Sequence, residues 1–413
     1  MSGNQPKGEV RRVPLRDVIT KIEAGVSVRS YDRPAQPGEK GVLKTSALAG
    51  GRFDPQENKL IREDELARAR VNPIAGCTLV SRMNTLALVG ESAYVEKDYP
   101  NLFLPDRIWQ LHPDQTRVDS RWLSLILASS QVRYVLRQLA SGTSGSMKNI
   151  SQDELLGVSV PLPPLPAQRR ISSLATLFDS IVSTVERIIA AKRKFKRGLM
   201  QALLTGRRRF PEFEGRPVEK CPFGSIVELR NEHYFPDKSN PRRCIELEHI
   251  ESGTGRITGE TLTTSENSVK FAFSAGDVLF GRLRPYLKKY AFPSFSGVCS
   301  TEIWVLRPRS ADLLPEFLFL LVQGEEVQRA ANVTSGSKMP RASWAVVAQA
   351  LVPMPTIEEQ RKICDIIASL DRELAALTEL ATHYQAQRRG LMQKLLTGEL
   401  AVPVSSEPEP VHA

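Results

Sequence analysis

Three short patterns in the chain contain residue types that enzymes use, and each lacks a residue that its chemistry needs. Asn72-Pro-Ile and Asn240-Pro-Arg lack the Pro-aromatic continuation of an amino-methyltransferase motif. Pro236-Asp237 followed by Glu246-Leu-Glu248 approaches a nuclease P-D…E-x-K pattern, but the final Lys, which would help hold the scissile phosphate, is Glu248. A G-x-x-x-x-G-K-[ST] phosphate-binding loop is also missing from the sequence. The sequence therefore predicts a protein that is not an enzyme.

Cysteine and histidine do not form a recognisable site either. The 5 cysteines and 5 histidines are scattered, and no C-x-x-C pair or metal-ligand spacing occurs. We therefore expect reduced thiols, no metal and no cofactor in this chain. Residues 1–12 have no apolar stretch typical of a secretory signal, so we expect a cytoplasmic protein without a membrane segment.

Basic residues carry more information. The net charge of +10 and the pI near 9.4 favour a polyanionic partner. Each half of the chain has an Arg directly after a strand-like run, and each has a Gly/Ser loop that ends in cations. Small residues let a backbone approach a phosphate, Lys and Arg supply charge, and Asn or Arg can bind a base edge. The candidate DNA-binding residues are Arg82, Ser146, Lys148, Asn149, Arg242, Arg243, Arg282, Arg284, Lys288, Lys289, Ser337, Lys338 and Arg341. The alternative is that they are solvated surface residues.

A ten-residue sequence occurs twice and indicates what positions these candidates. Arg197–Gly206 returns as Arg389–Gly398 with one difference, Ala202 against Lys394. Each copy ends a segment that begins with a Pro-rich stretch and Gln168-Arg or Gln360-Arg, at a constant offset of 192 positions. Apolar residues recur at 3-4 spacing through both segments, which predicts two long helices that pair along a narrow stripe. The predicted seam comprises Ile171, Leu174, Phe178, Ile181, Val185, Ile188, Phe195 and Leu199, and Ile363, Ile366, Leu370, Leu377, Leu380, Tyr384 and Leu391.

The regions before the two helices also correspond. Gly76–Arg82 matches Gly276–Arg282, and Ile108–Leu111 matches Ile303–Leu306, with offsets that drift only where loops change length. We predict strands at 76–80, 85–89 and 107–111 and a helix at 120–139. The predicted fold class is α+β, with two pseudo-repeated α/β domains separated by two long helices that form an antiparallel coiled coil. The predicted parts are 1–160, first domain; 161–209, central helix; 210–352, second domain; 353–400, C-terminal helix; and 401–413, a disordered tail.

From about Val13 to Leu400, this arrangement resembles the specificity (S) subunits of type I restriction–modification systems. The most specific marks are the Gln168-Arg and Gln360-Arg starts, the two Leu-Met-Gln-x-Leu-Leu-Thr-Gly ends, and the Gly-Asp-Val-Leu-Phe run at 276–280. The resemblance implies two target recognition domains that read the halves of a split, asymmetric site in double-stranded DNA. It also implies that the paired helices fix the gap and dock two methyltransferase (M) subunits, with restriction (R) subunits joining the complex. S-adenosylmethionine, ATP and Mg would then act in the partner subunits.

A structural adaptor that uses its helices for assembly and binds proteins is the main alternative. The two readings differ in salt dependence, because DNA binding weakens steeply with added salt as counterion release becomes less favourable. A third possibility is a specificity protein that partners a methyltransferase without any nuclease. We also predict that lengthening the helices near Ala190 would widen the gap between half-sites.

Overall fold

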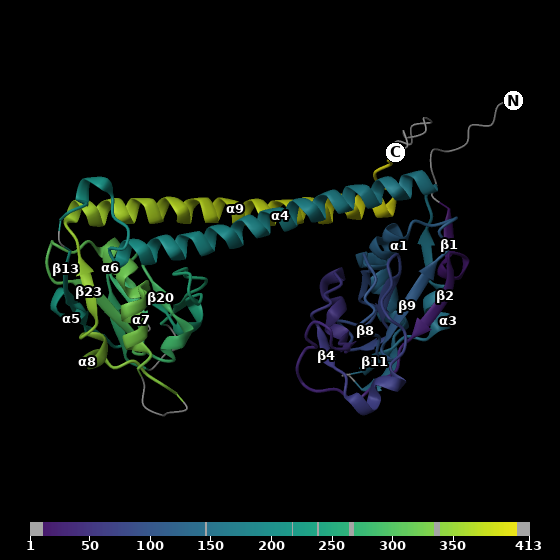
Figure 1. Cartoon of the computed structure of the whole chain (residues 1–413), viewed down its shortest axis with the longest axis horizontal. Helices are drawn as coiled ribbons and strands as arrows, with labels where there is room; N and C mark the ends of the chain where they lie inside the picture. The colour runs from purple at the N-terminus through teal and green to yellow at the C-terminus, as the bar shows by residue number, and fades with distance from the viewer. Residues whose placement is uncertain are drawn as a thin grey trace. The chain divides into compact units, whose positions relative to one another are not determined.

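In the computed structural model, residues 11–144, 147–216, 218–237, 239–263, 268–333 and 339–402 can be described. They form two compact units, one within residues 1–184 and 381–413 and the other within residues 185–380. Two long helices, α4 (Leu165–Leu204) and α9 (Ile357–Thr397), contribute residues to both units (Figure 1). The predicted fold class, with two mixed units and two long helices, is confirmed.

The first unit contains a four-stranded antiparallel sheet in the order β2-β9-β5-β7, two three-stranded sheets, β4-β3-β8 and β10-β11-β6, and the pair β1-β12. The strands are β1 Arg12–Pro14, β2 Ile19–Ala24, β3 Gly41–Leu43, β4 Asn58–Leu60, β5 Thr78–Ser81, β6 Met83–Asn84, β7 Ser92–Tyr94, β8 Leu102–Phe103, β9 Ile108–Pro113, β10 Ser141–Ser144, β11 Met147–Asn149 and β12 Ser159–Pro161. The helices are α1 Ser120–Leu127, α2 Ser130–Leu139 and α3 Gln152–Gly157.

The second unit repeats this plan, with a four-stranded sheet in the order β14-β22-β19-β20, the pair β13-β23, and a five-stranded sheet in the order β15-β18-β21-β16-β17. The strands are β13 Glu219–Pro222, β14 Val227–Arg230, β15 His233–Tyr234, β16 Arg243–Ile245, β17 Thr261–Leu262, β18 Lys270–Phe273, β19 Val278–Gly281, β20 Tyr290–Ala291, β21 Gly297–Ser300, β22 Ile303–Pro308 and β23 Leu351–Met354. The helices are α5 Phe223–Ile226, α6 Pro315–Gln323, α7 Glu325–Ala331 and α8 Trp344–Val347.

Two of the predicted elements differ from the structure. Residues 86–90 form a turn rather than a strand, and Leu86 and Leu88 remain 49% and 37% exposed, so alternating apolar residues were not enough to form a strand here. The predicted helix at 120–139 is two helices, because Ser129 caps a new one: its side chain accepts a hydrogen bond from the Val132 N–H.

A buried glutamine joins each long helix to its unit. Gln168 and Gln360 are 1% and 0% exposed. The Gln168 amide accepts from the Asp119 N–H at 2.8 Å and donates to the carbonyls of Arg117 and Pro163. The bonds of Gln360 match: it accepts from the Leu314 N–H and donates to the carbonyls of Asp312 and Pro355. These bonds explain why the same Gln-Arg sequence begins both helices.

Replacing Gln360 with Leu is expected to destabilise the second unit by about 2 to 4 kcal/mol. The substitution leaves one backbone N–H and two carbonyls buried without their partner, and each such group costs roughly 1 to 3 kcal/mol. Urea unfolding followed by fluorescence measures the loss. Gln387→Leu, also on α9 but exposed, is the control. Equal stability of the Gln360 and Gln387 variants would contradict this role.

The repeated Leu-Thr-Gly sequence ends both long helices in the same way. Gly206 and Gly398 have φ of 72° and 79°, a left-handed conformation that glycine adopts without steric cost. The N–H of Arg208 donates to the carbonyl of Ala202, and the N–H of Leu400 donates to that of Lys394. The N–H of Gly206 also donates to the carbonyl of Leu203, and that of Gly398 to the carbonyl of Leu395, which is the C′-to-C2 bond of a helix that ends in glycine.

Within each unit, α4 and α9 pack with opposite chain direction. In the first unit, Ile171 and Ala175 near the start of α4 share a core with Met392 and Leu395 near the end of α9. In the second, Leu203 near the end of α4 shares a core with residues near the start of α9, including Ile363 and Ile367. Ion pairs join the helices as well: Arg388–Asp179 in the first unit, and Lys192–Glu373 and Lys196–Asp371 in the second.

The buried stripe differs from the predicted seam at alternate positions. Ile188, Phe195, Ile366 and Leu380 are 41%, 56%, 39% and 40% exposed. In each case the next residue along the chain is the more buried one: Ile189, Lys196, Ile367 and Ala381. Likewise, Ala175 and Val182 are buried, whereas the predicted Leu174 and Ile181 are only half-buried. The predicted and the observed stripes both follow 3-4 spacing; they share every second position and differ by one residue at the others. The pairs Ile188-Ile189 and Ile366-Ile367 have an apolar residue at both alternatives, so the sequence there fits either stripe. Leu174, Phe178, Ile181, Leu199, Leu370, Leu377, Tyr384 and Leu391 are half-buried, and Ile171, Val185 and Ile363 are buried.

The pairs Ile188-Ile189 and Ile366-Ile367 allow the position of the buried stripe to be tested. Ile189→Ala is expected to cost about 2 to 4 kcal/mol of stability, because it removes buried methylenes and leaves a cavity. Ile188→Ala should change stability by less than about 0.5 kcal/mol, because its side chain is exposed. Urea unfolding of the two variants, with Ile367→Ala and Ile366→Ala as a second pair, provides the comparison. The reverse order in either pair would contradict the observed seam.

Arg209, in the Arg207–Arg209 run that follows α4, has a structural partner. Its guanidinium donates to both carboxylate oxygens of Glu359, at 2.9 and 2.5 Å, and both side chains are largely buried. The Glu359 N–H is capped in turn by the Thr356 hydroxyl. This pair fixes the loop after α4 against the start of α9, so Arg209 belongs to the helix junction rather than to a free phosphate-binding run.

Candidate nucleic-acid interface

In the first unit, three separate chain segments meet at Arg82. It directly follows β5, its N–H donates to the carbonyl of Arg107 just before β9, and its own carbonyl accepts from the N–H of Ile150 just after β11. The next residue, Met83, pairs with Asn149 in an antiparallel ladder. The side chains of Arg82, Arg107 and Asn149 therefore project from one small hydrogen-bonded frame.

The second unit has the same frame around Arg282, directly after β19. The N–H of Arg282 donates to the carbonyl of Glu302, and its carbonyl accepts from the N–H of Ala342. Leu283 pairs with Arg341 as Met83 pairs with Asn149. We call Arg82, Arg107 and Asn149 the first frame and Arg282, Glu302 and Arg341 the second frame. The sequence predicted the equivalence of Arg82 and Arg282, and the backbone bonds confirm it.

Each central arginine lies over a tryptophan of the neighbouring strand. The guanidinium carbon is 5.7 Å from the ring centroid of Trp109 in the first unit and 5.9 Å from that of Trp304 in the second. The Nε of each arginine is buried without a hydrogen-bond partner in the described parts of the chain. A guanidinium within about 6 Å of an aromatic ring is attracted to the ring face, and its planar fork of donors is suited to bidentate binding.

The side chains of the two frames differ in charge. Glu302 accepts three hydrogen bonds of 2.7 to 3.0 Å from Arg341, and its carboxylate lies 4.0 Å from Arg282. The Arg341 hydrogen bond lowers the pKa of Glu302, against the opposing effect of burial, so this acid remains ionised. The first frame has Arg107 at the position of Glu302. No side-chain partner of Arg107 occurs among the described residues.

Sequence reasoning missed Arg107, Glu302 and both tryptophans. They lie on or beside strands that follow the central arginines by 20 or more residues, and strand pairing brings them together. The recurring [Arg/Glu]-Ile-Trp order at 107–109 and 302–304 was the available signal.

Two other predicted residues of the first unit lie close to its frame. The Lys148 ammonium donates to the carbonyl of Gly142 at 2.8 Å, within the same β-hairpin. The Oδ1 atom of Asn149 is buried and has no hydrogen-bond partner in the portion of the chain that is described. Ser146, Ser337 and Lys338 were also predicted, and they lie outside the described residues, as do residues 403–413 of the predicted tail.

The remaining cations of the second unit fall into two groups. Arg242 lies over Tyr234, while Arg243 lies over Phe295 and forms an ion pair with Glu260. Arg284, Lys288 and Lys289 are on or after the short turn that follows the second frame.

That turn is conformationally unusual. Arg284 and Lys288 are exposed and both have φ of 50°, a left-handed conformation that non-glycine residues seldom adopt. Lys289 differs, because its ammonium group donates a hydrogen bond to the Ile250 carbonyl of the same unit. Arg284 and Lys288 thus extend the cationic surface beside the frame, whereas Lys289 holds the turn in place.

The second frame opens onto a cleft of about 440 Å³. Two frame arginines, Arg282 and Arg341, line it together with Trp304 and Trp344. The other lining residues are Leu229, Asn231, Phe271, Ala342 and Ser343. Arginine forks, an amide and aromatic faces are the groups that contact nucleic-acid bases and phosphates.

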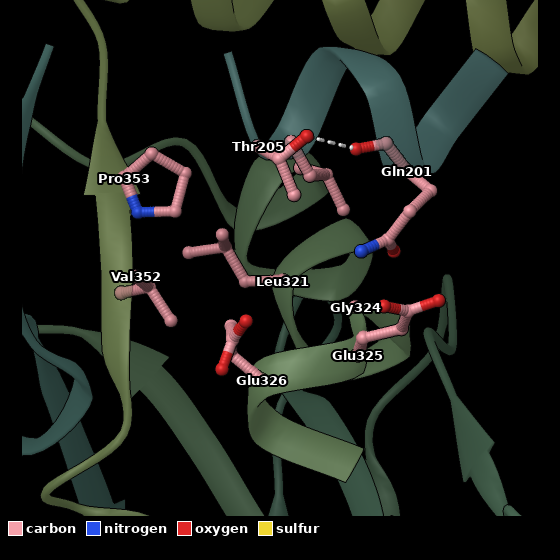
Figure 2. A pocket seen from close by; sticks show the side chains of 9 residues that line it. Gln201, Thr205, Leu321, Gly324, Glu325, Glu326, Val352 and Pro353 are labelled. Atoms are coloured by element: carbon pink, nitrogen blue, oxygen red, sulfur yellow. Dashed lines mark hydrogen bonds between the residues drawn. The ribbon is translucent and has the colours of Figure 1, made fainter. Parts of the chain in front are cut away.

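A second, narrower pocket lies where the end of α4 packs over α6, α7 and β23. Figure 2 shows Gln201 and Thr205 on one side and Glu325 and Glu326 on the other, with the Thr205 hydroxyl bonded to the Gln201 carbonyl at 2.7 Å. Its volume of about 20 Å³ has room for little more than a water molecule. This pocket is therefore too small for a substrate or nucleotide.

Cys77, His112 and Glu23 lie in the order of a cysteine hydrolase triad. The Cys77 Sγ is 3.5 Å from His112 Nδ1, and His112 Nε2 is 2.6 Å from a Glu23 carboxylate oxygen. Burial raises the pKa of the Cys77 thiol to about 11, with further increases from the charges of Glu23 and Asp98. A buried thiol that stays protonated at neutral pH is a poor nucleophile, so this cluster is structural.

Two further searches cover only the described residues. They contain no group of three or more Cys, His, Asp or Glu side chains placed to hold a metal ion. Among them, no helix has both the length and the apolar character needed to cross a membrane.

The architecture defines a class: tandem-duplicated proteins in which two mixed α/β units alternate with two long helices. A sequence model of the type I restriction modification DNA specificity domain matches residues 9–191 and 216–383. The chain belongs to this family of specificity subunits, which recognise DNA for type I restriction–modification systems and are generally not catalytic.

One relative and one solved structure each align with nearly the whole chain. The putative type I restriction enzyme MjaX specificity subunit of Methanocaldococcus jannaschii is 21% identical over 439 residues, which covers 97% of each chain. The MjaVIII specificity subunit of the same organism is 22% identical, covering 64% of this chain and 67% of the relative. The type I restriction–modification S subunit structure from M. genitalium has 15% identity and a TM-score of 0.54, covering 96% of this chain and 98% of the other.

Proposed function

We propose that the two units read the two halves of a split, asymmetric DNA site. The observation that carries this proposal is the pair of frames, in which an arginine held on a tryptophan meets two further polar side chains. Their backbone geometry is the same and their side chains differ, so two related readers with different base preferences are expected. A palindromic site would require identical side chains.

We further propose that α4 and α9 set the distance between the half-sites. Each helix is continuous, with 40 and 41 residues. A paired helix is stiff, whereas a flexible linker would allow a range of spacings. The length of the helices would then determine how many base pairs separate the two contacts.

The same helices would dock two methyltransferase subunits, and restriction subunits would join through that complex. S-adenosylmethionine, ATP and Mg would act in those partners. Exposed apolar residues on the helices, including Leu177, Ile188 and Phe195, offer a surface for such docking.

The first experiment is long-read detection of methylated adenine in the host genome with and without this gene. Loss of one split, asymmetric motif upon deletion is the expected result, and it would also supply the recognised sequence. An unchanged methylome in a strain that demonstrably expresses the chain would contradict the proposal.

DNA binding at increasing salt provides an independent readout on the purified complex. Affinity should fall steeply, because each neutralised phosphate releases counterions on binding. A protein-binding adaptor would show no such slope.

A further inference from the structure

The second frame has an acidic residue, Glu302, at the position where the first frame has the basic residue Arg107. An acidic side chain does not increase the general affinity of a surface for DNA. Glu302 repels every phosphate that approaches it, and it occupies the Nε and one terminal nitrogen of Arg341. Such a feature reduces binding to all sequences alike unless it selects among them. The position of Glu302 between two arginines that line an open cleft therefore calls for a role in selection.

Exposure indicates that the trio can reach a ligand. The side chains of Arg282, Glu302 and Arg341 are 37%, 27% and 45% exposed. Arg282 and Arg341 line the cleft of about 440 Å³, and the guanidinium carbon of Arg282 lies 5.9 Å from the ring centroid of Trp304. The carboxylate is thus half-buried between two cations but still open to solvent.

The donors and acceptors of the trio complement one base pair. In the major groove an arginine fork donates to guanine O6 and N7, and a carboxylate accepts from the N4 amino group of cytosine. Arg282 supplies the fork and Glu302 the adjacent acceptor, while Arg341 holds Glu302 in place. A phosphate matches only the arginines and is repelled by the acid.

We propose that Glu302 is a specificity-determining residue of the second unit: with Arg282 it selects a G·C pair in one half-site and excludes the phosphate backbone from the frame. This inference rests on the proposed DNA-reading function. The first frame, with Arg107 and Asn149 in place of Glu302 and Arg341, has no acid and therefore lacks this selection. The two half-sites should differ at the position that the frames contact.

The test replaces Glu302 with Gln in the full chain and maps methylated adenine in the host lacking the native gene. Removal of the charge frees Arg341 and Arg282 to bind phosphate. The expected motif is broadened at one position of one half-site, a position that is G·C for the native chain, and the other half stays unchanged. Glu302→Asp keeps the negative charge but shortens the side chain by one methylene, so it should give an intermediate degree of broadening.

Glu228→Gln is the matched control. It removes one negative charge and one ion pair from the same unit, since Glu228 bonds to Arg307 at 2.9 Å. Arg307 does not line the cleft, whereas Arg282 and Arg341, the partners of Glu302, do. Its motif should equal the native one. Thermal unfolding shows that each variant is folded.

The outcomes separate the two proposals. If the native chain gives no split motif, the proposed function fails. If the native chain does give a split motif, the proposed function stands. The inference about Glu302 is then wrong if Glu302→Gln gives the native motif, gives the same change as Glu228→Gln, or broadens the motif at a position that was not G·C.

Discussion

A chain with one extra heptad in each long helix is expected to methylate sites whose halves lie about three base pairs further apart. Because the helices run in opposite directions, duplicating residues 185–191, just before Lys192 in α4, and residues 374–380, just after Glu373 in α9, places the two new segments opposite each other on the same side of the Lys192–Glu373 ion pair. Seven residues add about 10 Å to a helix, and a step along DNA is about 3.4 Å. Because a heptad repeats the 3-4 spacing, the buried stripe continues through both insertions.

Methylome sequencing of the expressing host measures the new spacing. The bases within each half-site should be unchanged, because neither unit is altered. Duplication in α4 alone is the control: its seam has no partner over one heptad, so we expect lower stability and weak methylation. Retention of the native gap by the doubly extended chain would contradict the role of the helices as a spacer.

Substitution of a central arginine is expected to weaken specific DNA binding by tenfold to a hundredfold. Arg82→Ala and Arg282→Ala each remove a fork whose bidentate contact with a base is worth about 1 to 3 kcal/mol. Because the two residues lie in separate units, the double variant should show the product of the two losses. Binding is measured on the cognate duplex with the purified complex.

Arg329→Ala controls for net charge. Arg329 lies on α7, is well exposed and forms an ion pair with Glu326 three residues earlier. Its replacement should reduce affinity for all sequences slightly and equally. If Arg82→Ala and Arg282→Ala lowered cognate and random DNA binding by the same factor, the frames would be phosphate contacts and not base readers.

The repeat predicted much of the architecture from sequence alone. The equivalence of Arg82 and Arg282 followed because each ends a strand of matching sequence, and the two helix ends followed from the repeated glycine. Glu302 and Arg107 could not be placed beside those arginines, because that contact depends on which strands pair. One sequence does not give strand pairing.

The seam shows how local pattern and tertiary packing differ. Apolar residues at 188–189 and 366–367 fit either of two adjacent stripes. Polar residues contained a usable signal. Continuing the 3-4 spacing between Leu370 and Leu391 places Glu373 and Gln387 on the predicted stripe. The observed stripe instead contains Leu374 and Arg388, and the aliphatic stem of an arginine can lie along a neighbouring helix. Packing of Ile171 and Ala175 into the first core then fixes the phase.

The glutamine junctions bear on how such a chain can change over time. The three N–H···O hydrogen bonds that each of Gln168 and Gln360 forms with the loops are all to main-chain atoms. Because these hydrogen bonds involve main-chain atoms of the loops, they can form with any unit whose loop has the same backbone path, whatever its side chains. Recombination between genes at these two points would therefore exchange a whole reader without disturbing the helix that follows it. A host could obtain a new DNA target in one genetic event, with every other protein of the system left as it was.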